Sequence, residues 1–443
     1  MPLNPTALKE FFEFLSIPSV SSEPSHHADV LRAADWVERY LKGLGFQTER
    51  WETPGFPTLF AHFQVNPSQP TLLIYNHYDV QPVDPLPLWT TPPFTPTIRE
   101  GEVYARGAQD NKGQCFYVLQ ALKSLLEKKG TLPLNIKLCI EGEEEVGSAG
   151  LASILERHSK ALQADYLAIV DVGIPASHIP SVTLGVRGLV SLDVTFKGSS
   201  TDLHSGSHGG IAYNPIHALI HVLAEARHPD GSIAIPRFYD GIQSGSKDDF
   251  DLIFDPQQYQ EQFKALPVGG ETRYSPLERN WLRPTLEING ISGGYAGDGF
   301  KTVIPAEAKA KLSCRLVPGQ DPQKIGECVT EFLLEKAPKS MQVDVRIRPG
   351  TGLALRALRD SKGVQAFAQA FSEVFEQPCR FILDGASIPV VSALAQLSGA
   401  ETVLVGLGLS TDKIHAPNEH FGLDRLERGQ AVIVRALEIL GEG

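Results

Sequence analysis

Basic residues are in the minority in this 443-residue sequence. It contains 40 Lys and Arg against 52 Asp and Glu, which gives a formal net charge of −12. A protein that holds nucleic acid through phosphate contacts needs a basic surface, so this balance argues against a nucleic-acid partner. Carboxylates clustered inside a site would add to the same acidity.

Cysteine and long apolar runs are also scarce. The five cysteines include no C-x-x-C pair; they are Cys115, Cys139, Cys314, Cys328 and Cys379. This scattered set argues against a disulfide framework or a thiolate zinc site and fits reduced thiols in a cytosol. No apolar run approaches the roughly 20 residues that cross a bilayer, and the segment MPLNPTALKEFFEF lacks the features of a signal peptide. We therefore expect a cytoplasmic protein without membrane contact.

The first part of the chain alternates between helical and strand-like patterns. Helical periodicity covers 5–15, 28–43, 112–129 and 149–158, and apolar strand-like segments lie at 47–51, 58–64, 71–76, 134–140 and 166–170. This alternation predicts an α/β domain with a mostly parallel sheet flanked by helices.

The pattern changes near Gly185. The segment 186–197 alternates like a half-exposed strand, and the elements that follow suggest an α+β module with an antiparallel sheet. After Asp384 the chain returns to the first style, with a helix, the apolar strand 402–405 and a final helix to 440. We predict one large domain from 1–184 and 385–443, with a smaller domain inserted at 185–384.

A polar cluster follows directly on an apolar strand at TLLIYNHYD (71–79). Because side chains alternate along a strand, His77 and Asp79 point to the same face. In a buried parallel sheet both would lie at the carboxyl end, where open α/β sheets bind ligands. A carboxylate beside a histidine is typical of a metal-binding imidazole, although a strand ending in a polar turn is the commoner explanation of His-x-Asp taken alone.

Similar residues follow other apolar strands. Glu144 and Glu145 come after the strand at 134–140, Asp171 after 166–170, and His415 after the strand at 402–405. Asp110 lies in the Gly-flanked loop RGAQDNKG. Taken alone, these could be a solvated acidic turn, a turn initiator or a surface histidine. Together they place two histidines and several carboxylates at one edge of one sheet.

Imidazole and carboxylate ligands without thiolate suit zinc, manganese or cobalt. Two such ions about 3.5–4 Å apart form a site that can add water to an amide. The adjacent Glu144 and Glu145 would not both face the same metal, so one would bind metal and the other would hold the water.

The motifs resemble those of a known enzyme family. They are NHYDV (76–80), RGAQDNKG (106–113), EGEEEVGS (141–148), IVD (169–171), DLHSG with GG (202–206, 209–210), KTVIP (301–305), CRLVP (314–318), GASIPV (385–390) and IHAPNE (414–419). In this order they are similar to the di-metal peptidases and amidohydrolases that include carnosinase, cytosolic nonspecific dipeptidase, aminoacylase, acetylornithine deacetylase and carboxypeptidase G. DLHSG, CRLVP and SIPV together resemble the dipeptidase branch.

The resemblance implies a ligand set for two divalent metal ions. His77, Asp110 and Asp171 would hold one ion, and Asp110, Glu145 and His415 the other, with Asp110 bridging. Zinc is the expected metal, and manganese or cobalt are alternatives.

The resemblance also implies catalytic roles. Asp79 would orient the metal-binding histidine before it, Glu144 would act as general base, and the peptide bond Asp110–Asn111 would be cis. His204, in the inserted domain, would reach the active site of a partner subunit and stabilise the oxyanion, which implies a homodimer formed through that domain.

Substrate contacts are implied at three further positions, Thr302, Arg315 and Ser387. Arg315 lies in the apolar stretch KAKLSCRLV, where an unpaired cation would be costly, so it needs an anionic partner. A substrate carboxylate and a structural Asp or Glu are both candidates. The segment RPGTGLALRALRD (348–360) lacks the histidine that carnosinase-like members place there, which leaves the dipeptide preference open.

The function expected from these features is hydrolysis of the amide bond of small peptides by a catalytic domain with an inserted lid and dimerisation domain. The alternative is the same chemistry on N-acyl or N-carbamoyl amino acids. A catalytically inactive metal-stabilised scaffold would have no use for Glu144, so the intact site argues against it.

Overall fold

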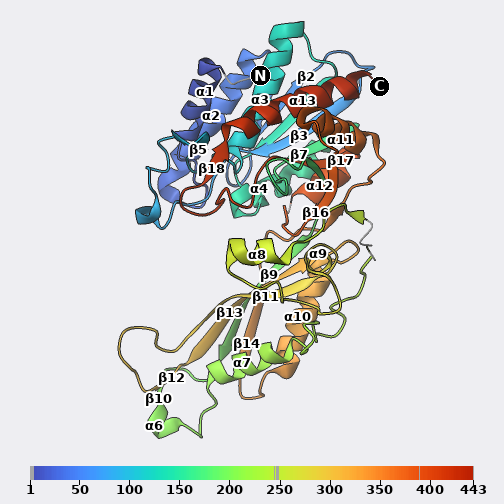
Figure 1. Cartoon of the computed structure of the whole chain (residues 1–443). Coiled ribbons are helices and arrows are strands. Elements are labelled where there is room, and N and C mark those ends of the chain that lie inside the picture. Colours follow the sequence, from blue (N-terminus) through green and yellow to red (C-terminus); the bar gives the residue numbers. More distant parts are fainter. Residues whose placement is uncertain (1–3, 244, 246–248, 389, 443) are drawn as a thin grey trace.

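The computed structural model describes residues 4–243, 245, 249–388 and 390–442 (Figure 1). Pro389, in the motif GASIPV, lies outside the described residues. The chain forms a large α/β unit and a smaller unit that extends from it (Figure 1). No helix in the described part is long and apolar enough to span a membrane.

The large unit is built on a nine-stranded mixed sheet. Its order is β1-β2-β6-β3-β7-β17-β8-β15, with β16 paired to β8. The four central strands β6, β3, β7 and β17 run parallel. β1 is antiparallel to β2, β2 to β6, and β8 to both β17 and β15, whereas β16 is parallel to β8. The bounds are β1 Gln47–Trp51, β2 Thr58–Phe63, β3 Thr71–His77, β6 Asn135–Glu141, β7 Tyr166–Val170, β8 Ser181–Val186, β15 Leu355–Arg356, β16 Arg380–Asp384 and β17 Glu401–Val405.

Helices cover both faces of this sheet, which explains why its strands are apolar on both sides. In β3, Leu72 and Ile74 pack into the core of one face, and Leu73 and Tyr75 into the core of the other. The first core contains α1 Pro5–Leu15, α2 His27–Gly43, α3 Lys112–Lys129, α11 Lys362–Phe375 and α13 Leu423–Glu442. The second contains α4 Ala149–Ile154 and α12 Val391–Ser398. The predicted α/β architecture is thus confirmed.

The smaller unit contains a four-stranded antiparallel sheet in the order β11-β13-β9-β14. The bounds are β9 Gly188–Lys197, β11 Thr285–Gly293, β13 Glu307–Leu316 and β14 Gln342–Ile347. Alternate residues of β13, from Ala308 to Leu316, pack against α7 Pro215–Glu225 and α10 Pro322–Lys336, and the residues between them face the open side of the sheet. The start of α10 follows from its sequence, since Asp321 accepts hydrogen bonds from two backbone N–H groups and Pro322 fits the first turn.

Shorter elements decorate both units. A small sheet is formed by β4 Thr97–Arg99, β5 Glu102–Tyr104 and β18 His420–Gly422. At the far tip of the smaller unit lie β10 Leu203–His204, β12 Val303–Ile304 and α6 Ser205–His208 (Figure 1). The helices α8 Pro256–Phe263 and α9 Pro276–Trp281 lie where the two units meet (Figure 1).

The boundaries of the insertion differ from the predicted 185–384. Both β15 and β16 pair with β8 of the large sheet, and α11 packs against α13 and β17. The helix–strand pattern of 361–384 fits an α+β and an α/β unit equally well, so only its pairing assigns it. We propose that the inserted unit spans roughly Arg187 to Arg348, and we use this name for it below.

Candidate metal centre

The predicted ligands meet at the carboxyl edge of the central parallel strands. His77 ends β3, Asp171 follows β7, and Glu145 lies in a short turn of 3-10 helix directly after β6. Asp110 lies in the loop before α3, and His415 lies in the loop that leaves β17. The topology therefore brings together residues that are more than 300 positions apart.

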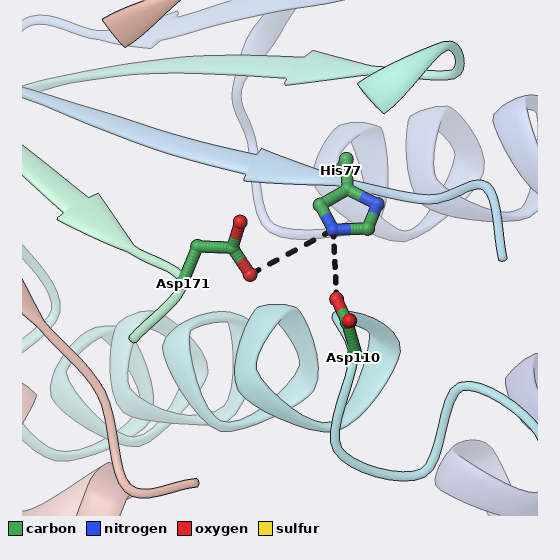
Figure 2. A group of neighbouring side chains, drawn as sticks. All are labelled: His77, Asp110 and Asp171. Carbon is green, nitrogen blue, oxygen red and sulfur yellow. Dashed lines mark hydrogen bonds and ion pairs between the residues drawn. The ribbon is translucent and has the colours of Figure 1, made fainter. Parts of the chain in front are cut away.

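One ligand group consists of His77, Asp110 and Asp171 (Figure 2). The His77 Nε2 atom lies 3.1 Å from Asp110 Oδ1 and 3.7 Å from Asp171 Oδ1. Asn111 donates a hydrogen bond of 2.5 Å to the same Asp171 oxygen, which fixes its orientation. The peptide bond Asp110–Asn111 is cis, as the resemblance implied.

A second group consists of Asp110, Glu145 and His415. The His415 Nε2 atom lies 3.0 Å from Asp110 Oδ2 and 3.2 Å from Glu145 Oε2. Asp110 therefore turns one oxygen toward each group, which is the arrangement of a carboxylate that bridges two ions.

The donor set fits divalent cations. In each group the donor atoms lie within 4.8 Å of one another, and all are imidazole nitrogens or carboxylate oxygens. Glu145 Oε1 is buried and has no hydrogen-bond partner in the described structure. Burial raises the pKa of Glu145 to about 7 and also raises the pKa of Asp171, and the negative charge of Asp110 raises both further, although the neighbouring histidines lower them. Bound cations would give the Glu145 oxygen a partner and would offset the repulsion between the carboxylates.

Asp79 connects the histidine to the acidic turn. Its Oδ1 lies 3.2 Å from His77 Nδ1, a contact that favours the tautomer with Nε2 free to bind metal. The same carboxylate accepts the backbone N–H groups of Glu144 at 3.2 Å and Glu145 at 3.1 Å. Ser21 donates to it at 2.7 Å. One fully buried carboxylate thus fixes both a ligand and the turn that presents the two glutamates.

Glu144 lies beside the ligand groups and belongs to neither. Burial raises its pKa well above the usual value, and the charges of Asp171, Glu145 and Asp110 raise it further while His77 lowers it. The two neighbouring glutamates therefore have different surroundings: Glu145 contacts His415, whereas the Glu144 carboxylate remains available for another partner.

Sequence reasoning gave no role to Glu419, although its motif was noted. Glu419 is fully buried and accepts hydrogen bonds from the backbone N–H groups of Gly107, Gln109 and Asp110 at 2.9, 3.0 and 3.0 Å. Arg106 donates to the same carboxylate at 2.7 Å. Glu419 therefore holds the loop that carries Asp110, the residue shared by the two candidate ligand groups. Its place four residues after His415 was the one available signal.

His204 and Thr302 lie elsewhere, at the exposed tip of the inserted unit (Figure 1). The pairing of β10 with β12 brings His204 Nε2 within 3.2 Å of Thr302 Oγ1. Neither residue belongs to a ligand group of this chain.

Arg315 and Ser387 lie near the junction of the units. Arg315 is at the end of β13, and the Ser387 hydroxyl donates to the carbonyl of Gly188 at 3.1 Å. Arg315 pairs with Leu189, so both positions lie at the start of β9, where the inserted unit joins the large unit.

Comparison with known proteins places the chain in a family. The sequence profile of "Peptidase family M20/M25/M40" matches residues 73–439. The Cys-Gly metallodipeptidase dug1 of Schizosaccharomyces pombe is 30% identical over 94% of this chain and 91% of its own length. The human Beta-Ala-His dipeptidase is 30% identical over 82% of this chain and 73% of its own length.

Solved structures agree with this assignment. The M20 family metallo-carboxypeptidase Sso-CP2 from Sulfolobus solfataricus has a TM-score of 0.90 and 31% identity, covering 99% of both chains. The dipeptidase Dug1p from Saccharomyces cerevisiae has a TM-score of 0.86 and 26% identity, covering 100% of this chain and 97% of its own. The resemblance seen in the motifs is confirmed, and the chain belongs to the peptidase family M20/M25/M40.

Proposed function

We propose that this protein hydrolyses the peptide bond of dipeptides with two divalent metal ions. The observation that carries the proposal is the pair of ligand groups that share Asp110, one through each carboxylate oxygen. Because these relatives are named as dipeptidases, we propose a dipeptide rather than an N-acyl amino acid as the substrate of this protein. The nitrogen and oxygen donors suit zinc, with manganese or cobalt as alternatives.

His77, Asp110 and Asp171 would hold one ion, and Asp110, Glu145 and His415 the other. When bound, the two ions would polarise the substrate carbonyl and lower the pKa of a water molecule, so that it can lose a proton and attack the carbonyl carbon.

Glu144 supplies the proton transfers. Its carboxylate lies beside both groups without belonging to either, so it can accept a proton from the attacking water. It then delivers this proton to the leaving amine nitrogen, which is the usual cycle of a general base that becomes a general acid. Asp79 keeps the His77 ring oriented throughout.

Arg315 would bind the carboxylate of the substrate's C-terminal residue. It extends from the open face of the inserted sheet, and its guanidinium makes no hydrogen bond or ion pair with the described residues. A guanidinium matches a carboxylate through two parallel hydrogen bonds. Ser387, near the same junction, would contact the substrate as well, and Thr302 would do so from the tip of a second subunit.

The tip of the inserted unit would act in a second subunit. His204 is exposed and lies far from the metal ligands of its own chain (Figure 1). The strand β11 is an edge strand, and its Ile288 and Ile291 are 47% and 52% exposed, while Ile220 on α7 is 51% exposed. A homodimer formed through these surfaces would cover apolar area and an open strand edge. His204 of one subunit would then stabilise the oxyanion in the other.

We also propose that the protein is located in the cytoplasm. All five cysteines are free, and four of them are buried, which fits a protein of the reducing cytoplasm.

Replacing the neighbouring glutamates separately tests the proposed roles. Glu144→Ala should keep two bound metal ions and lower turnover by about 10²–10⁴, the range of general acid–base catalysis. Glu145→Ala should lose metal, measured by elemental analysis after dialysis. Glu143→Ala removes a third carboxylate from the same run, one that contacts Thr53 instead of the ligands, and should change neither. Loss of metal from Glu144→Ala with both ions kept in Glu145→Ala would reverse the assignment.

A further inference from the structure

A cavity of about 540 Å³ lies in the inserted unit, between the open face of its sheet and the segment that contains α8 and α9. Its walls are unusually rich in arginine: Arg187, Arg227, Arg279, Arg283 and Arg315 line it. Two carboxylates, Glu271 and Glu287, also line it. We refer to this cavity as the arginine pocket.

Partners within the protein account for three of the five arginines. Arg283 donates to both oxygens of Glu271 at 2.8 and 3.2 Å. Arg227 lies 3.9 Å from Glu287 and donates to a backbone carbonyl at 2.7 Å. Arg279 donates to three backbone carbonyls on its own side of the pocket. Both pocket carboxylates are therefore already engaged.

Arg187 and Arg315 form no ion pair within 4 Å in the described structure, and the carboxylate of Asp384 attracts both from a greater distance. Arg187 is 8% exposed, and its guanidinium donates only to neutral oxygens, those of Gly385 at 2.9 Å, Asn280 at 3.0 Å and Arg283 at 3.5 Å. Arg315 makes no side-chain hydrogen bond with any residue that the structure describes. Charged side chains are rarely buried without a counter-ion, so this pair needs an explanation.

The two guanidinium groups are also close enough to repel each other. Arg187 lies directly before β9, and Arg315 pairs with Leu189 across the neighbouring strands. Burial and then the like charge of Arg315 lower the pKa of Arg187 to about 10. A buried and a half-buried cation side by side attract an anion, and one carboxylate would neutralise only half of their charge.

One wall of the pocket contacts the loop of the large unit that carries a candidate metal ligand. Tyr259 of α8 lines the pocket, and Gln262 of the same helix donates to Ser410 Oγ at 3.0 Å. Ser410 lies in the loop that carries His415. A short peptide with its scissile bond at the metal centre would extend toward this side.

We propose that the arginine pocket selects dipeptides whose C-terminal residue carries an acidic side chain. Arg315 binds the terminal carboxylate, and Arg187 binds the carboxylate of the side chain. The inference rests on the proposed dipeptidase activity and adds to it a substrate class, the dianionic C-terminal residue. A cavity of about 540 Å³ has room for a glutamate side chain.

The test compares alanyl-glutamate with alanyl-glutamine, which have nearly the same shape and differ in one charge. The wild-type enzyme, loaded with metal, should have a kcat/KM about 10-fold or more higher for alanyl-glutamate, the range expected for one buried charge-assisted contact. Arg187→Gln should abolish this preference, and Arg187→Lys should keep most of it. The ratio is measured within each variant, so a partial loss of folded protein leaves it unchanged.

Lys309→Gln is the matched control. Lys309 lies on the same open face of β13 but outside the pocket, where it pairs with Glu307 at 2.6 Å. Its loss removes one positive charge from the same sheet without touching the pocket, so the preference should persist.

Competition by small acids gives a second readout on the wild-type protein. Glutarate should inhibit the wild-type enzyme at least about 10-fold more strongly than its monoamide. This measurement needs no variant, so it can be made even if the Arg187 variants do not fold. Equal cleavage of the two dipeptides, or equal inhibition by the two acids, would overturn the acidic preference while leaving the dipeptidase function intact. If no dipeptide is cleaved by the metal-loaded enzyme, the proposed function fails instead. Direct calorimetric binding of glutarate against its monoamide then still decides the chemistry of the pocket.

Discussion

The Glu419 side chain contacts one described residue of the candidate ligand groups, Asp110, and it does so through the backbone N–H of that residue. Glu419→Gln therefore tests whether loop positioning alone controls the bridging ligand. The glutamate accepts four hydrogen bonds, three from backbone N–H groups and one from Arg106, and it donates none. A glutamine of the same size has one acceptor oxygen, and its NH₂ group would face donors in a buried site.

The expected loss follows from these contacts. Removing one partner of a buried ion pair typically costs about 3–5 kcal/mol of folding free energy, because the other charge stays buried. Arg106 and Glu419 are 1% and 0% exposed, so this range applies to them. Changing a group that orients a metal ligand typically lowers metal affinity or activity about 10–100-fold. Because Asp110 belongs to both ligand groups, Glu419→Gln should weaken the binding of both ions.

Two measurements separate positioning from general stability. Metal affinity is titrated with a chelator buffer, and Tm is measured on the metal-free protein. Glu271→Gln is the control, since it breaks the Arg283–Glu271 pair in the inserted unit, outside both ligand groups. That variant should lower Tm and leave metal affinity unchanged. If Glu419→Gln lowers Tm but binds both ions as tightly as wild type, the positioning role is refuted.

Three further predictions concern the metal, the substrate and the assembly. Burial raises the pKa of Glu145 to about 7, and hydrogen bonds to two carboxylates raise the pKa of His415 to about 11, so the metal-free site holds protons that metal must displace. Both folded-state pKa values lie above the unfolded ones, so the metal-free protein should lose stability as pH rises from about 5 to 9. Over the same pH range, the increase in Tm that added metal produces should become larger. An increase in Tm that does not change with pH would contradict this. Arg315→Ala should lower kcat/KM on a free dipeptide roughly 30-fold or more, with little further loss on the C-terminally amidated dipeptide; equal losses would make Arg315 a structural residue. His204→Ala and Glu144→Ala, each inactive, should regain partial activity when co-assembled, and a fully active monomer would refute action in trans.

The meeting of the candidate metal ligands could be predicted because it depends on local pattern and on one rule of topology. An apolar strand that runs directly into His77, and others that run into the acidic turn and Asp171, places these residues at strand ends. Parallel strands end at the same edge, so no knowledge of strand order was needed to bring them together. His415 was predicted for the same reason, through the short loop after β17.

Other features depend on contacts between distant residues, which local pattern does not contain. Glu419 acts on residues more than 300 positions earlier, and nothing in its neighbourhood reveals four convergent donors. The segment 361–384 has the pattern of a helix and a strand in either unit, and only its pairing with β8 assigns it. The helix expected over 149–158 is divided into α4 and a 3-10 turn at Leu155–His158, because periodicity does not distinguish these.

The connection between the units shows why so large an insertion leaves the metal centre intact. The chain leaves the large sheet after β8 and returns at β15, where Leu355 pairs with Val186. Just beyond, Leu189 and Gly352 exchange two backbone hydrogen bonds of 2.9 and 3.0 Å, so the outgoing and returning strands lie side by side. An insertion whose two ends meet adds no strain to the sheet that carries it. Arg187 lies at this crossing, and its bonds to Gly385 and Asn280 join the two units directly. The arginine pocket is thus fixed by the same junction that holds the inserted unit beside the metal-bearing edge.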